Sequence, residues 1–268
     1  MRLSKHHGLG NDFLVLLDPD GTREVAPEEA VALCDRRTGI GADGFMRATP
    51  GGPGAQVTME LLNADGSSAE MSGNGVRCLA QAVFLAGLAP PPAVRVSTDA
   101  GLRTVHLVSV LGPRGHRMSV EMGQAKVVGQ EPEWVDGDAL DAVRVDVGNP
   151  HVVLRWGAAE LPDRDELIRI GSRIDGATPG GANVEIVLPS AAPGELDMVV
   201  YERGVGPTLA CGTGACAVAA AGRDWELSAT TTVVHMPGGP AEISLGEPTL
   251  LTSDVTFIAT IDTMWPGR

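Results

Sequence analysis

The sequence predicts an α+β protein made of two pseudo-symmetric domains. Segments rich in Val, Leu and Met, separated by turn residues, dominate the 268-residue chain, and few segments show helical spacing. A Gly-rich turn that leads into an Ala-rich, small-residue segment occurs twice, at 70–75 and again at 209–214. The interval between the two turns is too long for a solenoid repeat, so it indicates an internal duplication.

Five strands and two helices are expected up to residue 122. The strands are 12–17, 57–62, 94–97, 103–110 and 118–122. Pro27 predicts the start of a helix at 28–37, where apolar residues recur at helical spacing. A second helix, at 76–88, is almost entirely apolar or small and should be buried on all sides. Pro90 begins the proline run that stops it.

The second half repeats this order of elements. Its expected strands are 143–147, 151–154, 184–188, 196–201, 230–235, 241–245 and 255–261, and its helices are 163–174 and 215–223. Glycine and proline cluster at 111–117, which places the domain boundary there. The domains are therefore expected at 1–116 and 117–251, with about 252–268 assigned as a strand that can return to the first domain.

Composition restricts the classes of partner. A net charge of −14 argues against nucleic acid and against an anionic membrane. Residues 1–7 are too polar for a secretory signal, and no apolar run is long enough to span a bilayer. The four cysteines have no metal-site spacing, so we expect reduced thiols, a cytoplasmic protein and no metal. Cys34, Cys78 and Cys216 lie in apolar helical segments and should be buried and inert.

Cys211 is the stronger of two candidate catalytic groups. It precedes Gly212-Thr213-Gly214 and the start of a helix, where free backbone N–H groups and the helix dipole favour negative charge. This setting predicts a lowered thiol pKa and a cradle for a carboxylate. The alternative is a buried structural cysteine on a tight turn.

Ser72 stands at the same place in the first turn, before Gly73-Asn74-Gly75. A hydroxyl is a much weaker acid than a thiol, and no Ser-His-Asp arrangement is discernible, so Ser72 reads most simply as a helix N-cap. Further along, Glu202 and Arg203 are adjacent opposite charges at a strand end. They could grip the ammonium and carboxylate of an amino acid, or form a surface ion pair.

Eight short segments, in order along the chain, carry a resemblance to the diaminopimelate epimerase family. They are GNDF (10–13), GIGADG (39–44), NADGS (63–67), GNGVR (73–77), GNPH (148–151), NVE (183–185), YERGVG (201–206) and ACGTG (210–214). Beyond residue 223 the resemblance is thinner. The family interconverts L,L- and meso-diaminopimelate without a cofactor, in lysine and cell-wall synthesis.

The resemblance implies that each domain is a mixed sheet wrapped around a central helix, with the site in the cleft between the domains. It implies that a set of polar residues binds the substrate: Asn11, Asn63, Asn149, Asn183, Glu202 and Arg203. The substrate carboxylate would be held by Gly73, Asn74, Gly212 and Thr213. His151 would lie beside the catalytic pair. A homodimer is the assembly common in the family.

Family members use two cysteines, one as a thiolate that takes the α-proton and one as a thiol that gives a proton to the opposite face. Cys211 fills one of these positions, and Ser72 replaces the other cysteine. Three explanations remain open: a Cys-to-Ser variant of an ordinary epimerase, a natural paralogue with altered chemistry such as a dehydratase, and a binding protein without activity. In the first case epimerisation should be impaired.

The substrate class has an alternative as well. A histidine or hydroxyproline racemase could share the fold. Diaminopimelate carries a distal amino-carboxylate that several asparagines and Arg203 could recognise, whereas a smaller ligand would need fewer polar groups. We therefore expect diaminopimelate, rather than a smaller amino acid, as the substrate.

Overall fold

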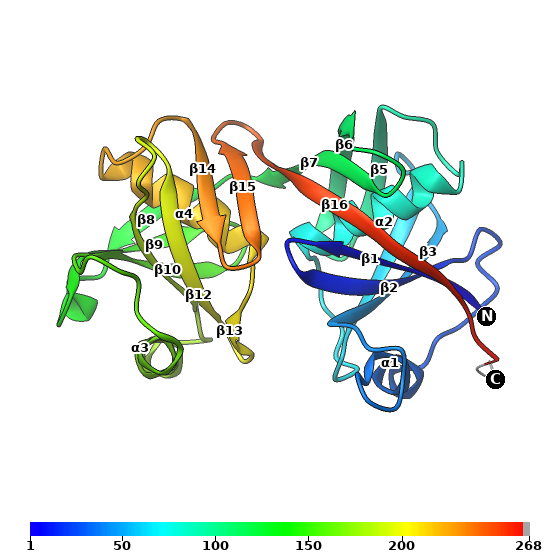
Figure 1. Cartoon of the computed structure of the whole chain (residues 1–268), viewed down its shortest axis with the longest axis horizontal. Helices are drawn as coiled ribbons and strands as arrows, with labels where there is room; N and C mark the ends of the chain where they lie inside the picture. The colour runs from blue at the N-terminus through cyan, green and yellow to red at the C-terminus, as the bar shows by residue number, and fades with distance from the viewer. Residues whose placement is uncertain (265–268) are drawn as a thin grey trace. The chain divides into compact units, whose positions relative to one another are not determined.

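A computed structural model describes residues 1–264 of the chain. It divides into two compact units (Figure 1). Unit 1 contains Met1–Val120 and the chain from Ser253 onward, and unit 2 contains Glu121–Thr252. The chain therefore leaves unit 1 within strand β7 (Gly115–Gly123) and returns within strand β16 (Thr249–Asp262).

The strands of unit 1 form a closed barrel. In sequence order they are β1 (Arg2–Gly8), β2 (Asn11–Leu17), β3 (Gly44–Pro50), β4 (Val57–Asn63), β5 (Ala93–Thr98), β6 (Gly101–Val110), β7 and β16. Each pairs with the next, and β16 pairs again with β1 in antiparallel register. The β2–β3 and β4–β5 pairs are parallel, so each requires a crossover connection.

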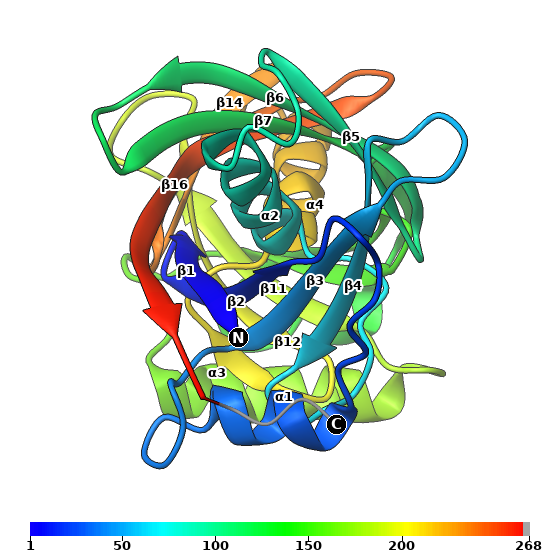
Figure 2. The same cartoon turned by 90° about the vertical axis from the view of Figure 1, so that its right-hand side faces the viewer.

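Two helices of unit 1 provide these crossovers. Helix α1 (Pro27–Cys34) has Pro27 in its first turn, as predicted, and packs Ala30 and Leu33 into a core with Leu14 and Phe45. Helix α2 (Gly73–Leu85) runs among the barrel strands (Figure 2). Its residues 73–83 are all buried, as the apolar and small composition predicts. The expectation fails at the far end, where residues 85–88 are exposed and the helix already ends at Leu85.

A buried polar cluster joins α2 to the strands that close the barrel. The Oε1 of Gln81 accepts from Nδ1 of His6 at 2.7 Å. Its Nε2 donates to Nδ1 of His116 at 2.7 Å and to the carbonyl of Val255 at 3.2 Å. Gln81 thus links β1, β7 and β16 from inside. Burial lowers the pKa of His6 to about 4, so its ring is neutral near neutral pH.

Unit 2 repeats the pairing pattern. Its elements are β8 (Lys126–Gln130), the short helix η1 (Pro132–Trp134), β9 (Ala139–Asp146), β10 (Pro150–Trp156), α3 (Arg164–Ala177), β11 (Asn183–Pro189), β12 (Leu196–Glu202), β13 (Gly206–Thr208), α4 (Gly212–Asp224), β14 (Thr231–Met236), β15 (Gly239–Ser244) and the start of β16. The parallel pairs β10–β11 and β12–β14 are crossed by α3 and α4, as α1 and α2 cross theirs. This repetition confirms the predicted α+β class with two pseudo-symmetric domains.

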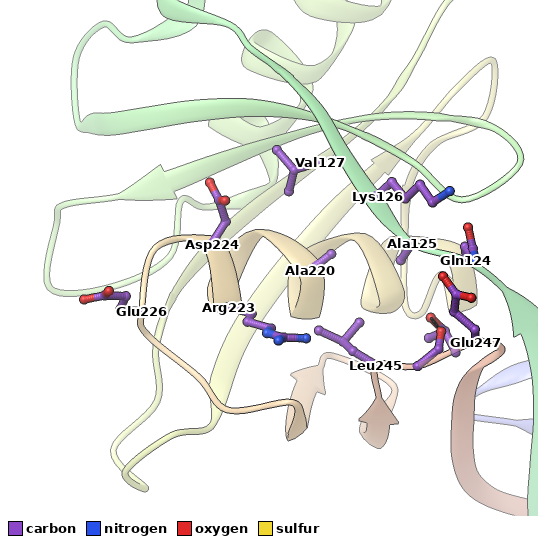
Figure 3. Close-up of a pocket in the computed structure, with 12 residues that line it drawn as sticks. Gln124, Ala125, Lys126, Val127, Ala220, Arg223, Asp224, Glu226, Leu245 and Glu247 are labelled. Carbon is purple, nitrogen blue, oxygen red and sulfur yellow. Dashed lines mark hydrogen bonds between the residues drawn. The ribbon is translucent and has the colours of Figure 1, made fainter.

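The two units differ in how their strand order ends: in unit 1 the first strand, β1, pairs with the last, β16. In unit 2 the strand order ends at β8, whose one strand neighbour among the described residues is β9. A cavity of about 550 Å³ lies beside β8, lined by Lys126, Arg223 of α4, and Leu245 and Glu247 of the β15–β16 connection (Figure 3). It lies by the C-terminal half of α4, away from the Cys211 end of that helix.

Two early strands were not predicted because they carry charged or polar side chains. Strand β1 contains Lys5, His6 and His7 and is held by pairing with both β2 and β16. Strand β3 contains Arg47, which is nearly buried because it donates to Asp18 at 2.8 Å and to Glu60 at 2.9 Å. Ion pairing of this kind is what allows an arginine into a core.

Candidate active site

Cys211 is the N-cap of α4, in extended backbone with φ −122° and ψ 117°. Its Sγ accepts from the amide of Gly214 at 3.4 Å and lies 3.4 Å from Oγ1 of Thr213. The residue is 6% exposed. The thiol therefore stands at the positive end of a helix, within contact of the first-turn amides.

The predicted lowering of the Cys211 pKa is wrong. Burial raises the pKa of the thiol well above its usual range, and the carboxylates of Glu202 and Glu185 raise it further. The bonds from Thr213 and Gly214 act in the opposite direction and are outweighed. Burial and the two nearby glutamates therefore outweigh the favourable helix end.

A chain of polar contacts leads from Cys211 into the core of unit 2. Oγ1 of Thr213 accepts from Nδ2 of Asn149 at 3.5 Å, and Oδ1 of Asn149 lies 3.1 Å from Nε2 of His151. On the other side of the ring, Nδ1 lies 2.8 Å from Oε1 of Glu185. We call these five residues (Asn149, His151, Glu185, Cys211 and Thr213) together with Gly212 and Glu202 the Cys211 site.

Glu202 and Arg203 have different partners, although they are adjacent at the end of β12. Oε1 of Glu202 accepts from Oγ1 of Thr208 at 2.5 Å, and burial raises the pKa of this carboxyl group. Arg203 donates from its backbone amide to Oδ1 of Asn183 at 3.0 Å and from Nη1 to the carbonyl of Gly180 at 3.2 Å. Asn183 thus holds the Arg203 turn, while Glu202 lies beside Cys211.

Ser72 occupies the matching place in unit 1. It is the N-cap of α2, with φ −131° and ψ 124°, and its Oγ accepts from the amide of Gly75 at 3.0 Å. The predicted N-cap role is confirmed. Backbone angles and bonding pattern agree with those of Cys211.

Polar residues surround this turn as well, and with Gly73 they form what we call the Ser72 site (Asn11, Ser72, Gly73, Asn74 and Arg77). Asn74 is 2% exposed and donates from Nδ2 to Oδ1 of Asn11 at 3.5 Å. Its own Oδ1 accepts from the buried Arg77 at 2.5 Å. Arg77 also bonds the carbonyl of Gly73 at 3.0 Å and the hydroxyl of Ser253. Asn63 is exposed at the end of β4, and Nδ2 donates to Oγ of Ser67 at 3.0 Å.

An ion cluster holds the side chain of Asn11 in place. Nδ2 of Asn11 donates to Oδ2 of Asp43 at 2.9 Å, and Arg36 bridges Asp43 and Asp12 at 2.7 and 2.6 Å. Lys5 lies 2.9 Å from Asp12. Burial would raise the pKa of Asp12, but Arg36 and Lys5 outweigh it and hold this pKa at about 2. Asp12 is therefore ionised throughout the ordinary pH range.

No role was predicted from the sequence for Glu185, Arg77 and Thr208, nor for the ion cluster of Lys5, Asp12, Arg36 and Asp43. Glu185 is a charged residue within the apolar strand NVEIVLP, and Arg77 lies within an almost wholly apolar helix. Both are fully buried. A lone charge inside an apolar segment was the signal that could have identified them. Thr208 has no comparable signal.

The remaining cysteines are buried, as expected. Burial raises the pKa of Cys34 to about 11 and that of Cys78 to about 12, so both stay protonated and inert. Within residues 1–264 no helix has the length and apolar character needed to cross a membrane.

Comparison with known proteins identifies the family of this chain. A family model described as diaminopimelate epimerase matches residues 3–128 and 143–256. The chain is 38% identical to the diaminopimelate epimerase of Rhodococcus jostii (strain RHA1), across 99% of this chain and 98% of that one. It is 40% identical to the one of Thermobifida fusca (strain YX), across 91% of each chain. A chloroplastic diaminopimelate epimerase of Oryza sativa subsp. japonica is 38% identical across 91% of this chain and 73% of its own.

Solved structures share the fold at low sequence identity. A probable proline racemase from Agrobacterium radiobacter K84 has a TM-score of 0.72 at 16% identity, covering 99% of this chain and 93% of its own. A hydroxyproline epimerase from Agrobacterium vitis has a TM-score of 0.71 at 15% identity, covering 97% and 90%. Likeness at this identity shows the fold, while the family follows from the close relatives and the matched segments. The chain, a cofactor-independent epimerase by descent, belongs to the diaminopimelate epimerase family.

Proposed function

We propose that this chain binds diaminopimelate and moves its α-proton through Cys211, and that Ser72 slows full interconversion of the L,L and meso forms. The relatives named diaminopimelate epimerase support the substrate. The proton-transfer roles are supported by one observation: Cys211 and Ser72 are the N-caps of the corresponding helices α4 and α2.

Epimerisation needs one group that takes the α-proton and one that returns a proton to the opposite face. The α-proton is a very weak acid, so the carbanion requires electrostatic support from N–H groups at a helix end. Proton transfer is efficient when both groups have pKa values near the working pH. A thiol meets that condition far better than a hydroxyl, which needs a strong base beside it. Ser72 accepts from Gly75, and none of its described contacts is such a base.

The binding roles follow the same proposal. Asn11, Asn63, Asn149, Asn183, Glu202 and Arg203 contact the substrate. Gly73 and Asn74, with Gly212 and Thr213, present first-turn amides to its reacting carboxylate. His151 supports the proton transfer without contacting the α-carbon.

Two further properties belong to the proposal. We infer a cytoplasmic protein, supported by four cysteines that are all free. We infer a homodimer from family membership.

Solvent-deuterium exchange at the α-carbon tests the function. In D₂O the chain should label the α-carbon of diaminopimelate but convert one stereoisomer into the other very slowly. Ser72→Cys should raise the rate of interconversion by at least about a hundredfold, the scale of a positioned acid or base. Ser68→Cys, an exposed thiol in the same loop, is the matched control and should leave the rate unchanged.

Two results would contradict the proposal. Interconversion by the unchanged chain at an ordinary enzymatic rate would show that Ser72 is no impediment. No gain from Ser72→Cys would favour a dehydratase or a binding protein instead, and thermal shifts across diaminopimelate, histidine and hydroxyproline would then identify the ligand class.

A further inference from the structure

Arg77 is a fully buried guanidinium that donates to three acceptors in two elements of unit 1. Nε donates to the carbonyl of Gly73 at 3.0 Å, Nη2 to Oδ1 of Asn74 at 2.5 Å, and Nη1 to the hydroxyl of Ser253. Gly73 and Asn74 are in the first turn of α2, directly after Ser72, whereas Ser253 lies in β16. Burying a charged side chain is costly relative to an apolar residue of similar size. Stability alone therefore gives no reason for an arginine here.

The guanidinium determines which way the Asn74 side-chain amide points. An arginine side chain has N–H donors but no acceptor, and it keeps its proton in proteins. The oxygen of the Asn74 amide must therefore face Arg77, and its nitrogen must face away. That nitrogen lies 3.5 Å from Oδ1 of Asn11.

The amide of Asn11 is oriented independently, from its other side. Its Nδ2 donates to Oδ2 of Asp43 at 2.9 Å, and the same oxygen accepts from the backbone amide of Asp12 at 3.0 Å. A backbone N–H can only donate, so Oδ2 is an acceptor, and Asn11 must turn its nitrogen to Asp43 and its oxygen to Asn74. The Arg77 guanidinium and the Asp43 carboxylate thus impose the same direction on the two asparagines between them.

Arg77 also holds the backbone of the first turn of α2. The carbonyl of Gly73 that accepts from Nε belongs to the same planar peptide unit as the amide of Asn74. Fixing this carbonyl therefore fixes the direction of an N–H group at a helix N-terminus, where such groups favour a bound anion. The side-chain amide and the backbone amide of Asn74 both depend on one guanidinium.

We propose that Arg77 is a positioning residue of the Ser72 site: it orients the side-chain amide and the backbone amide of Asn74, and Ser253 of β16 holds the guanidinium in place. Its effect on ligand affinity rests on the proposed function, in which Asn74 holds the substrate carboxylate. The orientation of the Asn74 side chain does not, because it follows from contacts within unit 1.

Arg77→Lys keeps the positive charge and removes the planar fork. A lysine ammonium is a single donor centre, so it does not serve three separate acceptors as a guanidinium does. The dissociation constant of diaminopimelate, measured by calorimetry, should therefore rise about tenfold, the scale of one hydrogen bond to a charged group. Arg47→Lys makes the same exchange at a nearly buried arginine of β3, outside the Ser72 site, and should leave the constant unchanged. An equal rise in both variants, or none in Arg77→Lys, would overturn the proposal.

A double-mutant cycle separates positioning from a general structural role. If Arg77 acts through Asn74, Arg77→Lys should cost clearly less affinity once Asn74 has been replaced by alanine. An equal loss in both backgrounds would contradict positioning. Ser253→Ala, which removes the contact from β16, should raise the dissociation constant about threefold, the scale of a neutral hydrogen bond. No change in that variant would exclude the role of Ser253.

NMR of the side-chain amides tests the proposal without a ligand. In the unchanged chain, the Nδ2 hydrogens of Asn74, assigned with an Asn74→Ala variant, should give stronger nuclear Overhauser contacts to Asn11 than to Arg77. An equal or reversed pattern overturns the proposal even if Arg77→Lys fails to fold. If the unchanged chain does not bind diaminopimelate, the proposed function fails, whereas the NMR pattern still decides the role of Arg77.

Discussion

Ser72 and Cys211 are N-caps of corresponding helices, and the side chain of each accepts from the backbone amide three residues later, at 3.0 and 3.4 Å. Their surroundings differ. Ser72 has the buried Arg77 in the first turns of its helix, whereas Cys211 has Glu185 and Glu202 close by. One local backbone structure thus holds two groups of different acidity in opposite electrostatic settings.

Cys211 should be required for α-proton exchange. Cys211→Ser leaves an N-cap that can still accept from Gly214, so the helix should form while deuterium exchange falls below detection. Cys34→Ala removes a buried thiol that stays protonated and should keep the exchange rate. Mass spectrometry of diaminopimelate incubated in D₂O measures both. Undiminished exchange in Cys211→Ser would exclude the thiol as the base.

Removing a nearby negative charge should make Cys211 more reactive. Glu202 raises the pKa of the thiol, so Glu202→Gln should lower that pKa and increase the thiolate fraction at any pH below it. Alkylation by iodoacetamide at pH 8, followed by peptide mass spectrometry, should then be faster than in the unchanged chain. Glu226→Gln, an exposed change in unit 2, serves as the control. A slower reaction would mean that Glu202 does not disfavour the thiolate.

Two glycines of α3 should respond oppositely to alanine. A Cβ at Gly171 would lie 2.3 Å from Cγ of Tyr201, so Gly171→Ala should lower the free energy of unfolding by about 2 kcal/mol. At Gly176 a Cβ meets nothing within 4 Å, and Gly176→Ala should raise it by about 0.5 kcal/mol. Urea denaturation of both variants measures the difference. Equal effects would contradict the packing of α3 on Tyr201.

Acid should destabilise unit 1 through His6. The folded pKa, about 4, lies below the ordinary value of 6.5, so between these pH values the unfolded chain binds a proton that the folded chain does not. The contribution of His6 to the free energy of unfolding is therefore fully present above pH 6.5. It is lost as the pH drops towards 4, and the loss is at most about 3 kcal/mol. His116, whose pKa burial also lowers, acts in the same direction.

Urea midpoints at pH 7.5 and pH 5 measure this dependence. His6→Asn should reduce it to the share contributed by His116, because asparagine does not titrate in this range. The neighbouring His7, which is not fully buried, provides the control variant His7→Asn, and the original slope should remain. A slope that survives undiminished in His6→Asn would place the titrating group elsewhere.

The sequence predicted most elements because hydrophobic pattern and turn residues specify them locally. Pro27 begins α1, and the apolar run after Ser72 forms α2. Strands β1 and β3 could not be predicted, since Lys5 donates to the carbonyl of Gly41 and Arg47 to the carboxylate of Asp18, both distant in sequence. The prediction of a lowered pKa for Cys211 was wrong for the same reason. The effect of the helix dipole can be inferred from the local sequence. Glu185 and Glu202, in contrast, are brought close to the thiol only by the tertiary fold.

Strand β16 gives the chain an order of assembly. Residues 253–262 fill the position between β1 and β7, yet they are synthesised after the whole of unit 2. A nascent chain that has emerged only as far as Thr252 therefore carries a complete set of residues for unit 2 and an N-terminal barrel with two unpaired strand edges. Although unit 2 comes second in the sequence, it can finish folding first, and the N-terminal unit closes only when the last strand arrives.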